Sequence, residues 1–197
     1  MTRIIAGSLK GRRLVVPPHI RASESKVRQA LFSILGQTVE GARVVDGFAG
    51  SGAMGIEALS RGAAQVIFLE SDQASLRALR RNLADIPPDA VTGRWDVWRG
   101  DALKLLHRLA EQGQQWDLII LDPPYGGQWG KKSLNAVVDY GILAPTGRLC
   151  LEHARHSAVP AEVGSLALRK QHRYGETVLS FYEVARPQAT AQPGHSP

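Results

Sequence analysis

The sequence has little cysteine and no long apolar run. Its one cysteine, Cys150, cannot form an internal disulfide or supply a zinc cluster, and its apolar neighbours Leu149 and Leu151 predict a buried structural thiol. No stretch approaches the roughly 20 consecutive apolar residues of a membrane helix. The first seven residues lack the apolar core of a signal peptide. We therefore expect a soluble, cytoplasmic protein.

Patterns that mark several other classes of protein are also missing. The absence of a G-x-S-x-G motif excludes the nucleophile elbow of a serine hydrolase. His153 and His156 have the spacing of a metal pair, but on a strand end that spacing does not place both on one face, and no further ligand is near. We expect no metal. There is also no internal repeat.

The composition and the charge distribution limit which classes of protein and of partner are still possible. The chain has 197 residues, 44% of them hydrophobic and 21% charged, which is typical of one compact domain with a small appendage. Residues 1–40 hold seven bases and two acids, whereas the rest of the chain holds 17 bases and 16 acids. The basic segment favours a polyanionic partner, with an ordinary solvated surface as the alternative.

The first part of the chain predicts a small extension. Two short strands over 3–6 and 13–16, joined by a glycine-containing turn, predict a basic hairpin. From the N-cap candidate Ser23 onward, apolar residues recur at helical spacing. Lys26 and Arg28 are expected on the exposed side of that helix.

Beyond residue 40, short apolar runs alternate with amphipathic stretches. Buried parallel strands are expected at 43–46, 65–70, 117–122 and 148–152, with a less regular one within 91–99, and helices at 53–61, 73–85, 101–112 and 131–140. Segments 166–173 and 177–184 predict an antiparallel hairpin at the sheet edge. The fold class is therefore α/β, with a Rossmann-like, doubly wound, mostly parallel sheet. We expect a hairpin and helix extension over 1–40, the α/β domain over 41–186, and a disordered tail over 187–197.

A glycine-rich loop follows the strand that ends at Asp46. Gly50 to Gly55 spells G-x-G-x-x-G between a strand and a helix, and Glu70 ends the next strand. Such glycines let the backbone approach a ligand closely, and a carboxylate at the second strand end accepts hydrogen bonds from ribose hydroxyls. The pattern fits any adenosyl ligand.

Asp46 discriminates between the adenosyl ligands. A carboxylate just ahead of the loop would repel the pyrophosphate of a dinucleotide but attract the ammonium group of S-adenosylmethionine, which carries a sulfonium and no phosphate. Asp101 follows the next strand and is placed near the adenine amino group, while Ser71 or Asp72 could assist at the ribose. For Asp72 and Asp101, a helix N-cap role is the alternative. Acids at successive strand ends favour a ligand site, because open α/β sheets bind ligands there.

The fourth strand ends in Asp122-Pro123-Pro124-Tyr125. Prolines fix their own φ angles and lack N–H groups, so Asp122 and the Pro123 carbonyl form a rigid pair of acceptors. An exocyclic base amine is a poor nucleophile because its lone pair is delocalised into the ring. Holding both of its hydrogens on these acceptors turns the lone pair toward a methyl sulfonium, while Tyr125 stacks on the base. In isolation the same motif would be a proline turn with a core tyrosine.

These motifs together resemble a known family. The Asp46–Gly52 loop with Asp122–Tyr125 is similar to the class I S-adenosylmethionine-dependent amino-methyltransferases. Arg3–Gly7 with Gly11-Arg12, the helix Lys26–Phe32 and the segment Phe48–Gly62 resemble, more narrowly, the RsmD-type 16S ribosomal RNA guanine-N2 methyltransferases. The resemblance covers residues 3–184, and Trp95, Trp98 and the tail after Arg186 depart from it. It implies methylation of one guanine amine in small-subunit RNA, within a partly or fully assembled subunit, and we expect a monomer.

The resemblance also implies site residues. The methyl donor, S-adenosylmethionine, is expected on the glycine loop and on the ends of the next two strands, at Asp46, Phe48, Ala49, Gly50, Ser51, Gly52, Glu70, Ser71, Asp72, Asp101 and Ala102. The target amine is expected at Asp122, Pro123, Pro124 and Tyr125. The charge argument adds RNA-binding candidates in the first 40 residues: Arg3, Lys10, Arg12, Arg13, Arg21, Lys26 and Arg28.

Other functions stay open at this point. The same chemistry could act on adenine or cytosine amines in DNA, or on a protein amide. Asp rather than Asn before the prolines, and a short chain without a target-recognition domain, argue against both. An NAD-dependent oxidoreductase and a catalytically silent RNA-binding module are the alternatives of a different class.

Overall fold

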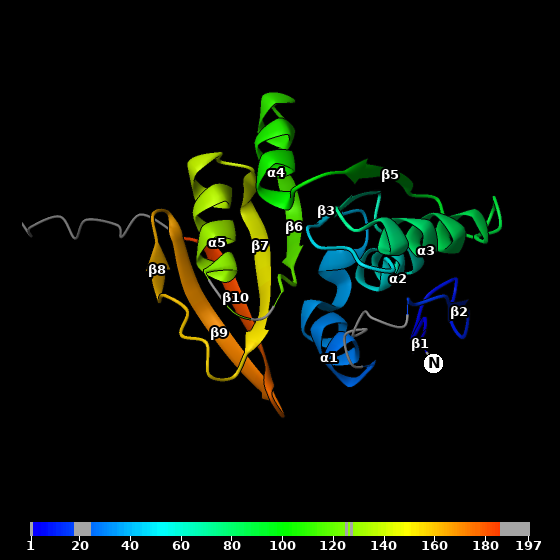
Figure 1. Ribbon diagram of the computed structural model, residues 1–197, viewed down its shortest axis with the longest axis horizontal. Helices are drawn as coiled ribbons and strands as arrows, with labels where there is room; N and C mark the ends of the chain where they lie inside the picture. Colours follow the sequence, from blue (N-terminus) through cyan, green and yellow to red (C-terminus); the bar gives the residue numbers. More distant parts are fainter. Residues whose placement is uncertain (1, 18–24, 125, 127, 186–197) are drawn as a thin grey trace, which may run out of the picture.

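The computed structural model describes residues 2–17, 25–124, 126 and 128–185 (Figure 1). Within them the chain forms, in order, β1 (Thr2–Arg3), β2 (Arg13–Leu14), α1 (Ser25–Leu35), the 3-10 helix η1 (Gly36–Val39), β3 (Arg43–Asp46), α2 (Ala53–Ser60), β4 (Gln65–Glu70), α3 (Gln73–Ala84), β5 (Arg94–Arg99), α4 (Ala102–Glu111), β6 (Trp116–Leu121), α5 (Trp129–Asp139), β7 (Leu143–Ala154), β8 (Glu162–Val163), β9 (Leu166–Tyr174) and β10 (Thr177–Val184).

The main sheet confirms the predicted α/β class. Its strands lie in the order β5-β4-β3-β6-β7-β10-β9-β8, with β5 and β8 at opposite ends (Figure 1). Strands β3 to β7 are parallel, and β10 is antiparallel to both β7 and β9. The short strand β8, which pairs with β9, was not predicted.

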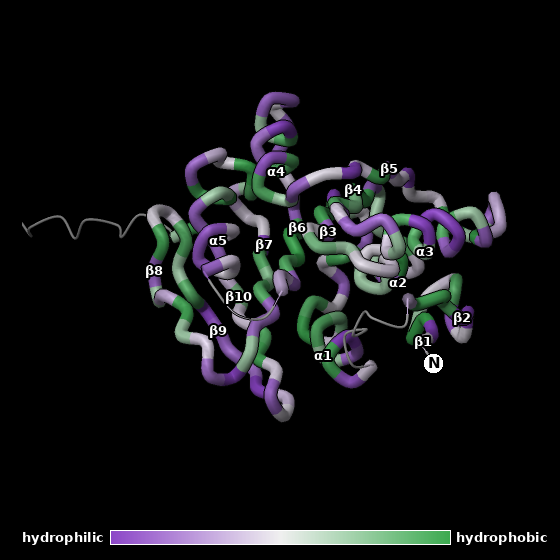
Figure 2. The backbone as a smooth tube through the Cα atoms, viewed as in Figure 1, coloured by the Kyte–Doolittle hydropathy of each residue, from purple (hydrophilic) through white to green (hydrophobic). Residues whose placement is uncertain are grey.

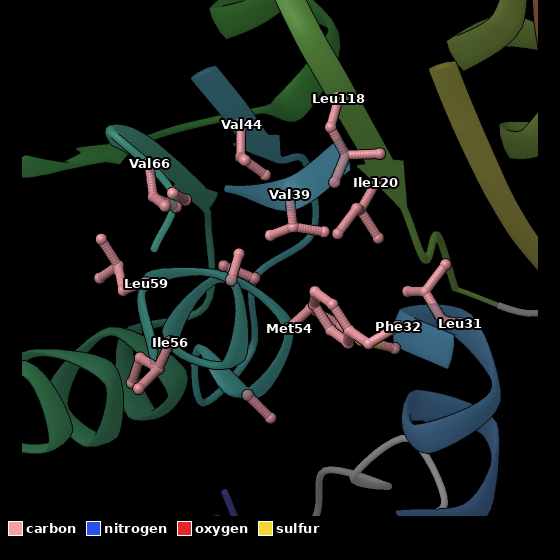
Figure 3. Close-up of a cluster of buried hydrophobic side chains, with 14 of the residues drawn as sticks. Leu31, Phe32, Val39, Val44, Met54, Ile56, Leu59, Val66, Leu118 and Ile120 are labelled. Carbon is pink, nitrogen blue, oxygen red and sulfur yellow. The ribbon is translucent and has the colours of Figure 1, made fainter. Parts of the chain in front are cut away.

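Side chains of alternate strand residues build two separate cores. Val44, Val66 and Leu118 face the layer of α1, α2 and α3, whereas Val45 and Ile67 face α4 and α5. Figure 3 shows the first core, where Leu31 and Phe32 of α1 lie beside Met54 of α2 and Ile120 of β6. This two-sided burial explains why the parallel strands read as continuous apolar runs. Figure 2 shows hydrophobic residues along the central strands.

The amino-terminal hairpin is held to the rest of the molecule by Glu57 of α2. This carboxylate is 0% exposed and accepts hydrogen bonds from the backbone N–H groups of Ile5, at 2.8 Å, and Ala6, at 3.0 Å. Because these groups bond to α2, strands β1 and β2 are shorter than the sequence predicts. Ile4, Leu9 and Leu14 are buried in the first core, to which α1 also belongs.

The expectation that Arg28 lies on the exposed side of its helix is wrong. Its side chain is 0% exposed, its Nε lies 3.7 Å from Glu57 Oε2, and its Nη2 donates to the Arg3 carbonyl at 2.5 Å. Burial lowers the pKa of Arg28, and the Glu57 charge works in the opposite direction. At helical spacing Arg28 shares a face with Leu31 and Leu35, so its position belongs to the core. It cannot reach an RNA phosphate.

Several predicted features lie outside the described residues. These are the N-cap candidate Ser23, the RNA-binding candidate Arg21, the stacking candidate Tyr125 and the tail 187–197. In the ranges that the structure does describe, no helix is long and apolar enough to span a membrane.

Candidate active site

The carboxyl ends of neighbouring parallel strands bring the predicted acids together. Asp46 at the end of β3 pairs in register with Phe68 of β4 and Ile120 of β6, and both of these side chains belong to the first core. Asp46 therefore points to that side of the sheet. The charges of Asp122 and Glu70 act on Asp46, so the three acids, distant in sequence, share one edge.

Asp46 is the buried member of this group. Its side chain is 3% exposed and accepts a hydrogen bond from the Gly55 backbone at 2.9 Å. Burial raises the pKa of Asp46 to about 7, and the charges of Asp122 and Glu70 add to the rise, while the Gly55 hydrogen bond opposes it. A cation placed beside Asp46 would relieve this repulsion and favour the ionised carboxylate.

Glu70 connects the end of β4 to the glycine loop. Its Oε2 accepts from the Gly50 N–H at 2.6 Å, and its Oε1 accepts from the N–H groups of Ser71 and Asp72, both at 2.7 Å. A carboxylate offers about four acceptor sites. The three backbone donors therefore leave room at Glu70 Oε2 for one ligand hydroxyl.

The loop itself requires glycine. Gly50 and Gly52 have φ angles of +54° and +83°, in the left-handed region, and a Cβ on Gly52 would lie 2.3 Å from Leu79 Cδ1. Ala49 and Ser51 are buried, and the half-buried Phe48 ring meets Trp129 edge-on at 6.4 Å. The loop thus presents backbone atoms to a ligand, and its buried residues hold it in place.

Asn82 of α3 holds this loop, and the sequence analysis missed it. Its Nδ2 donates to the Ser51 and Val15 carbonyls, both at 2.9 Å, and its Oδ1 accepts from the Val15 N–H at 2.8 Å. Asn82 therefore ties the hairpin to the glycine loop. The available signal was a polar residue beside the buried Leu79 and Leu83 in a helix.

Asp72 and Asp101 are helix N-caps. Asp72 accepts from the Ser75 N–H at 2.8 Å and Asp101 from the Lys104 N–H at 3.1 Å, at the starts of α3 and α4. Both carboxylates are exposed, as is Ser71, whereas Ala102 is buried. A ligand contact by either acid would come in addition to its capping role.

The Asp-Pro-Pro segment adjoins a cavity at the end of β6. Asp122 is half-buried, Pro123 is buried and Pro124 is exposed. A cavity of about 180 Å³ is lined by both prolines and also by Lys131, Glu152 and His153. A planar group held there would lie next to the acceptors of the motif.

Glu152 is a second residue that the sequence analysis missed. It is 4% exposed and follows Leu151, which pairs in register with Leu121, the residue before Asp122. Asp122 directly follows β6, next to the strand that holds Glu152, and the charges of both acids act on the buried Cys150 thiol. Glu152 ends a predicted strand, as the recognised acids do, so the same signal could have found it.

The remaining candidates have structural roles. His153 is buried with its Nε2 2.7 Å from Ser180 Oγ, whereas His156 is exposed beside Glu176, so the two rings do not form a pair. Among the described residues, no group of three or more His, Cys, Asp or Glu is arranged to hold a metal ion. Cys150 is buried, as predicted, and burial raises the pKa of its thiol.

The donor set fits a particular ligand chemistry. The loop 46–55 and the turn 70–73 contain acids and no lysine or arginine. Such a site would oppose a pyrophosphate and suits an adenosyl ligand with a positive charge and no phosphate. The glycine cradle leaves the backbone accessible to that ligand.

The sheet order and the glycine loop define a class I methyltransferase fold. A family model described as "Conserved hypothetical protein 95" matches residues 2–183, and the chain belongs to this family. The membership confirms the resemblance to RsmD-type methyltransferases that the motifs indicated.

Individual relatives match over nearly the whole chain. YlbH of Bacillus subtilis is 36% identical over 183 residues, 92% of this chain and 98% of that protein. Ribosomal RNA small subunit methyltransferase D of Escherichia coli K12 is 32% identical over 183 residues, 92% of this chain and 89% of that protein. The solved structure of yhhF from Escherichia coli superposes with a TM-score of 0.80 at 31% identity, covering 93% of this chain and 97% of that one.

Proposed function

We propose that this chain transfers a methyl group from S-adenosylmethionine to the exocyclic N2 amine of a guanine in 16S ribosomal RNA. The observation that carries the proposal is that Asp122, which precedes Pro123, lies at the same sheet edge as Asp46 and Glu70. This arrangement supports a target amine held next to the methyl donor. The relative from Escherichia coli named ribosomal RNA small subunit methyltransferase D supports the substrate class.

The glycine loop and the strand ends would hold the methyl donor. Gly50 and Gly52 present backbone, Asp46 faces the ammonium group, Glu70 accepts from the ribose and Asp101 lies toward the adenine. S-adenosylmethionine, when bound, supplies a methyl group on a positively charged sulfur. The protein's task is to aim the acceptor nitrogen at that carbon.

Asp122 and the Pro123 carbonyl would hold the two hydrogens of the target amine. This orients the nitrogen lone pair, and both acceptors strengthen their hold as positive charge develops on nitrogen. The carbon–sulfur bond breaks as the carbon–nitrogen bond forms, and the sulfur keeps the electron pair. Asp122 receives the proton that the methylated amine loses and, being half-buried, returns it to water.

The presence of Glu152 next to Asp122 favours guanine over adenine as the target base. Guanine presents N1–H and the N2 amine as adjacent donors, which suits two neighbouring carboxylates. Adenine presents an amine beside the N1 lone pair, and cytosine an amine beside the N3 lone pair. Either lone pair would face Glu152 and be repelled, which disfavours the adenine and cytosine alternatives.

The exposed bases of the first 40 residues would bind RNA phosphates. Arg3, Lys10, Arg13 and Lys26 are exposed and Arg12 is half-buried. Residues 1–40 would thus grip the RNA, while residues 41–186 perform the chemistry on a base unstacked into the pocket. We place this activity in the cytoplasm, with the chain acting as a monomer on a partly or fully assembled small subunit.

Transfer of labelled methyl tests the proposal. Small subunits lacking the modification, naked 16S RNA and DNA are each incubated with the enzyme and labelled S-adenosylmethionine. Label on ribosomal RNA is expected, and label on DNA alone would overturn the substrate class. Calorimetry with S-adenosylhomocysteine and NAD is expected to show binding of the first only; binding of NAD would favour the oxidoreductase alternative.

A further inference from the structure

The open edge of the main sheet carries an exposed tryptophan. β5 is the last strand on its side, and in the part of the chain that the structure describes no strand pairs with its outer edge. Trp95 of β5 is 38% exposed, and it and Val15 are the exposed large hydrophobic residues among those described. A single surface hydrophobic residue is ordinary, so the surroundings of Trp95 decide what it does.

Trp95 forms one wall of a groove against α3. The groove has a volume of about 340 Å³ and is lined by Arg80, Leu83, Ala84, Trp95, Asp96 and Val97. Along a strand, Trp95 and Val97 share one face and Asp96 takes the other. Asp96 accepts from Trp98 Nε1 at 3.0 Å, which holds its carboxylate toward Trp98. The groove therefore combines an aromatic ring, an aliphatic floor and a guanidinium group.

The helix behind this groove is basic along its exposed side. Arg77, Arg80 and Arg81, here named the α3 basic strip, are all exposed, and α3 contains no acid. The count of 17 bases against 16 acids beyond residue 40 conceals this strip, because Asp72 and Asp85 cap the two ends of α3 and Asp96 lines the neighbouring groove.

The strip joins the groove to the basic hairpin. Arg12 Nη1 donates to the carbonyl of Asp85, the C-cap of α3, and Ala84, one residue earlier, lines the groove. Figure 1 shows α3 between β2 of the hairpin and β5. The hairpin thus contacts the carboxyl-terminal end of α3, next to the groove that Arg80 and Trp95 line.

The two tryptophans of β5 differ in a way that defines the groove's chemistry. On the opposite face of the strand, the Arg108 guanidinium lies 4.6 Å from the Trp98 ring centroid and covers that ring. The exposed Trp95 leaves its ring accessible beside Arg80. Aromatic rings flanked by arginine are the platforms on which unpaired RNA bases stack, while arginines hold the phosphates.

We propose that this groove binds an unpaired nucleotide of the substrate RNA outside the active site, with its base stacked on Trp95 and its phosphate held by Arg80. The inference rests on the proposed function for the identity of the ligand. Trp95 pairs in register with Val66, four residues before Glu70, so the groove lies about 13 Å from the carboxyl edge at ~3.3 Å per residue. A contact so far from the reacting atoms affects RNA affinity and leaves the chemical step unchanged.

Steady-state kinetics on small subunits tests this site. Trp95→Ala is expected to raise KM for subunits about ten-fold, in line with the loss of one stacked base, with kcat within about two-fold. Trp95→Phe keeps a ring and is expected to restore most of the affinity. Arg80→Gln is expected to raise KM a few-fold. Lys104→Gln on α4, which neutralises an exposed base that does not line the groove, is the matched control.

The outcomes separate this inference from the proposed function. If the wild type transferred no methyl group to any RNA, the proposed function itself would be overturned. Normal transfer by the wild type together with an unchanged KM in Trp95→Ala would overturn the groove site alone. A second copy of this chain is the competing occupant of the groove, and sedimentation of the wild type and of Trp95→Ala tests for it. A self-associated wild type together with a monomeric Trp95→Ala would assign the groove to that second copy and overturn the inference.

Discussion

Two charged regions of this molecule are built in opposite ways. At the carboxyl edge of the sheet, Asp46 and Glu152 are buried and Glu70 is fixed by three backbone donors. On the hairpin and α3, Lys10, Arg13 and the α3 basic strip are exposed. Acids held at fixed positions can select individual ligand atoms, whereas exposed bases attract phosphate charge without selecting atoms. Under the proposed function, the acidic edge carries the chemistry and the exposed bases carry affinity for RNA.

The pair Arg28 and Glu57 joins the two regions and belongs to neither. Both side chains are 0% exposed, and between them they hold the Arg3 carbonyl and the N–H groups of Ile5 and Ala6. The pair is thus a structural link between the basic hairpin and α2, the helix that begins at the glycine loop.

Removing the carboxylate proposed to hold the target amine should have the largest effect. Asp122→Ala is expected to lower kcat about 10²- to 10³-fold, the usual effect of deleting one preorganised electrostatic contact. S-adenosylhomocysteine affinity should change little, because that ligand rests on the other strand ends. Single-turnover transfer with matched calorimetry measures both, and near-normal kcat would contradict the assigned role.

Breaking the buried link should destabilise the whole molecule. Glu57→Ala leaves the Arg28 guanidinium buried without its partner, which costs about 3–5 kcal/mol of the free energy of unfolding. Urea unfolding measures the loss. Arg28→Met in the Glu57→Ala background should recover part of it; additive losses from the two substitutions would show that the pair does not interact.

Acidification should weaken donor binding. The pKa of Asp46 is raised to about 7 by burial, so its protonated form favours the folded state, and this contribution to stability is lost as the pH rises through 7. The α-ammonium group, which S-adenosylhomocysteine shares with S-adenosylmethionine, requires the ionised carboxylate. The affinity for S-adenosylhomocysteine is therefore expected to rise up to about ten-fold per pH unit from pH 5.5 and to level off above 7.

Asp46→Asn supplies the control for this pH dependence. The amide does not titrate, so the variant should bind more weakly with a flatter pH profile. An equal slope in the wild type and the variant would contradict the assignment of this pH dependence to Asp46.

Changing Glu152 should alter base selection. Glu152→Gln is expected to lower methylation of guanine roughly ten-fold, as expected for one base-edge contact. Subunits reconstituted with 2-aminopurine at the target lack N1–H and keep the amine. The wild type should prefer guanine over 2-aminopurine and the variant should lose much of that preference; an unchanged ratio would exclude contact between Glu152 and N1.

Single changes on the basic surface should have the smallest effects. Arg13→Gln and Lys26→Gln should each weaken RNA binding a few-fold and reduce the slope of log affinity against log salt by about one. Lys170→Gln on β9, also exposed but on another part of the sheet, is the control. A loss of S-adenosylhomocysteine affinity in the hairpin variants would contradict the separation of the two regions.

The sequence predicted features that depend on one strand or helix at a time, such as strand bounds and the residues at strand ends. The bounds of β3 and β4 are those expected, because each is a continuous apolar run limited by charged or polar residues. The clustering of Asp46, Glu70 and Asp122 also followed, since parallel strands end at a common edge. Strand β7 begins at Leu143 rather than at 148, because Pro145 and Gly147 resemble a turn in sequence yet lie within the strand.

Contacts between distant elements could not be predicted in the same way. Glu57 pairs with Arg61 at i+4, as helical periodicity allows, but its contacts with Ile5 and Ala6 lie more than 50 positions away and periodicity gives no sign of them. Arg28 was placed outside on the basis of its charge, because the buried carboxylate that stabilises it was unknown. Asn82 escaped notice for the same reason, since its role depends on Val15 and Ser51 meeting at α3.

Identification of the methylated nucleoside tests the central claim most directly. Ribosomal RNA from small subunits treated with the wild type or with Asp122→Ala is digested to nucleosides and analysed by mass spectrometry. The account predicts N2-methylguanosine with the wild type and its loss with the variant. A methyl group on adenosine or cytidine, or N2-methylguanosine formed equally by both proteins, would contradict it.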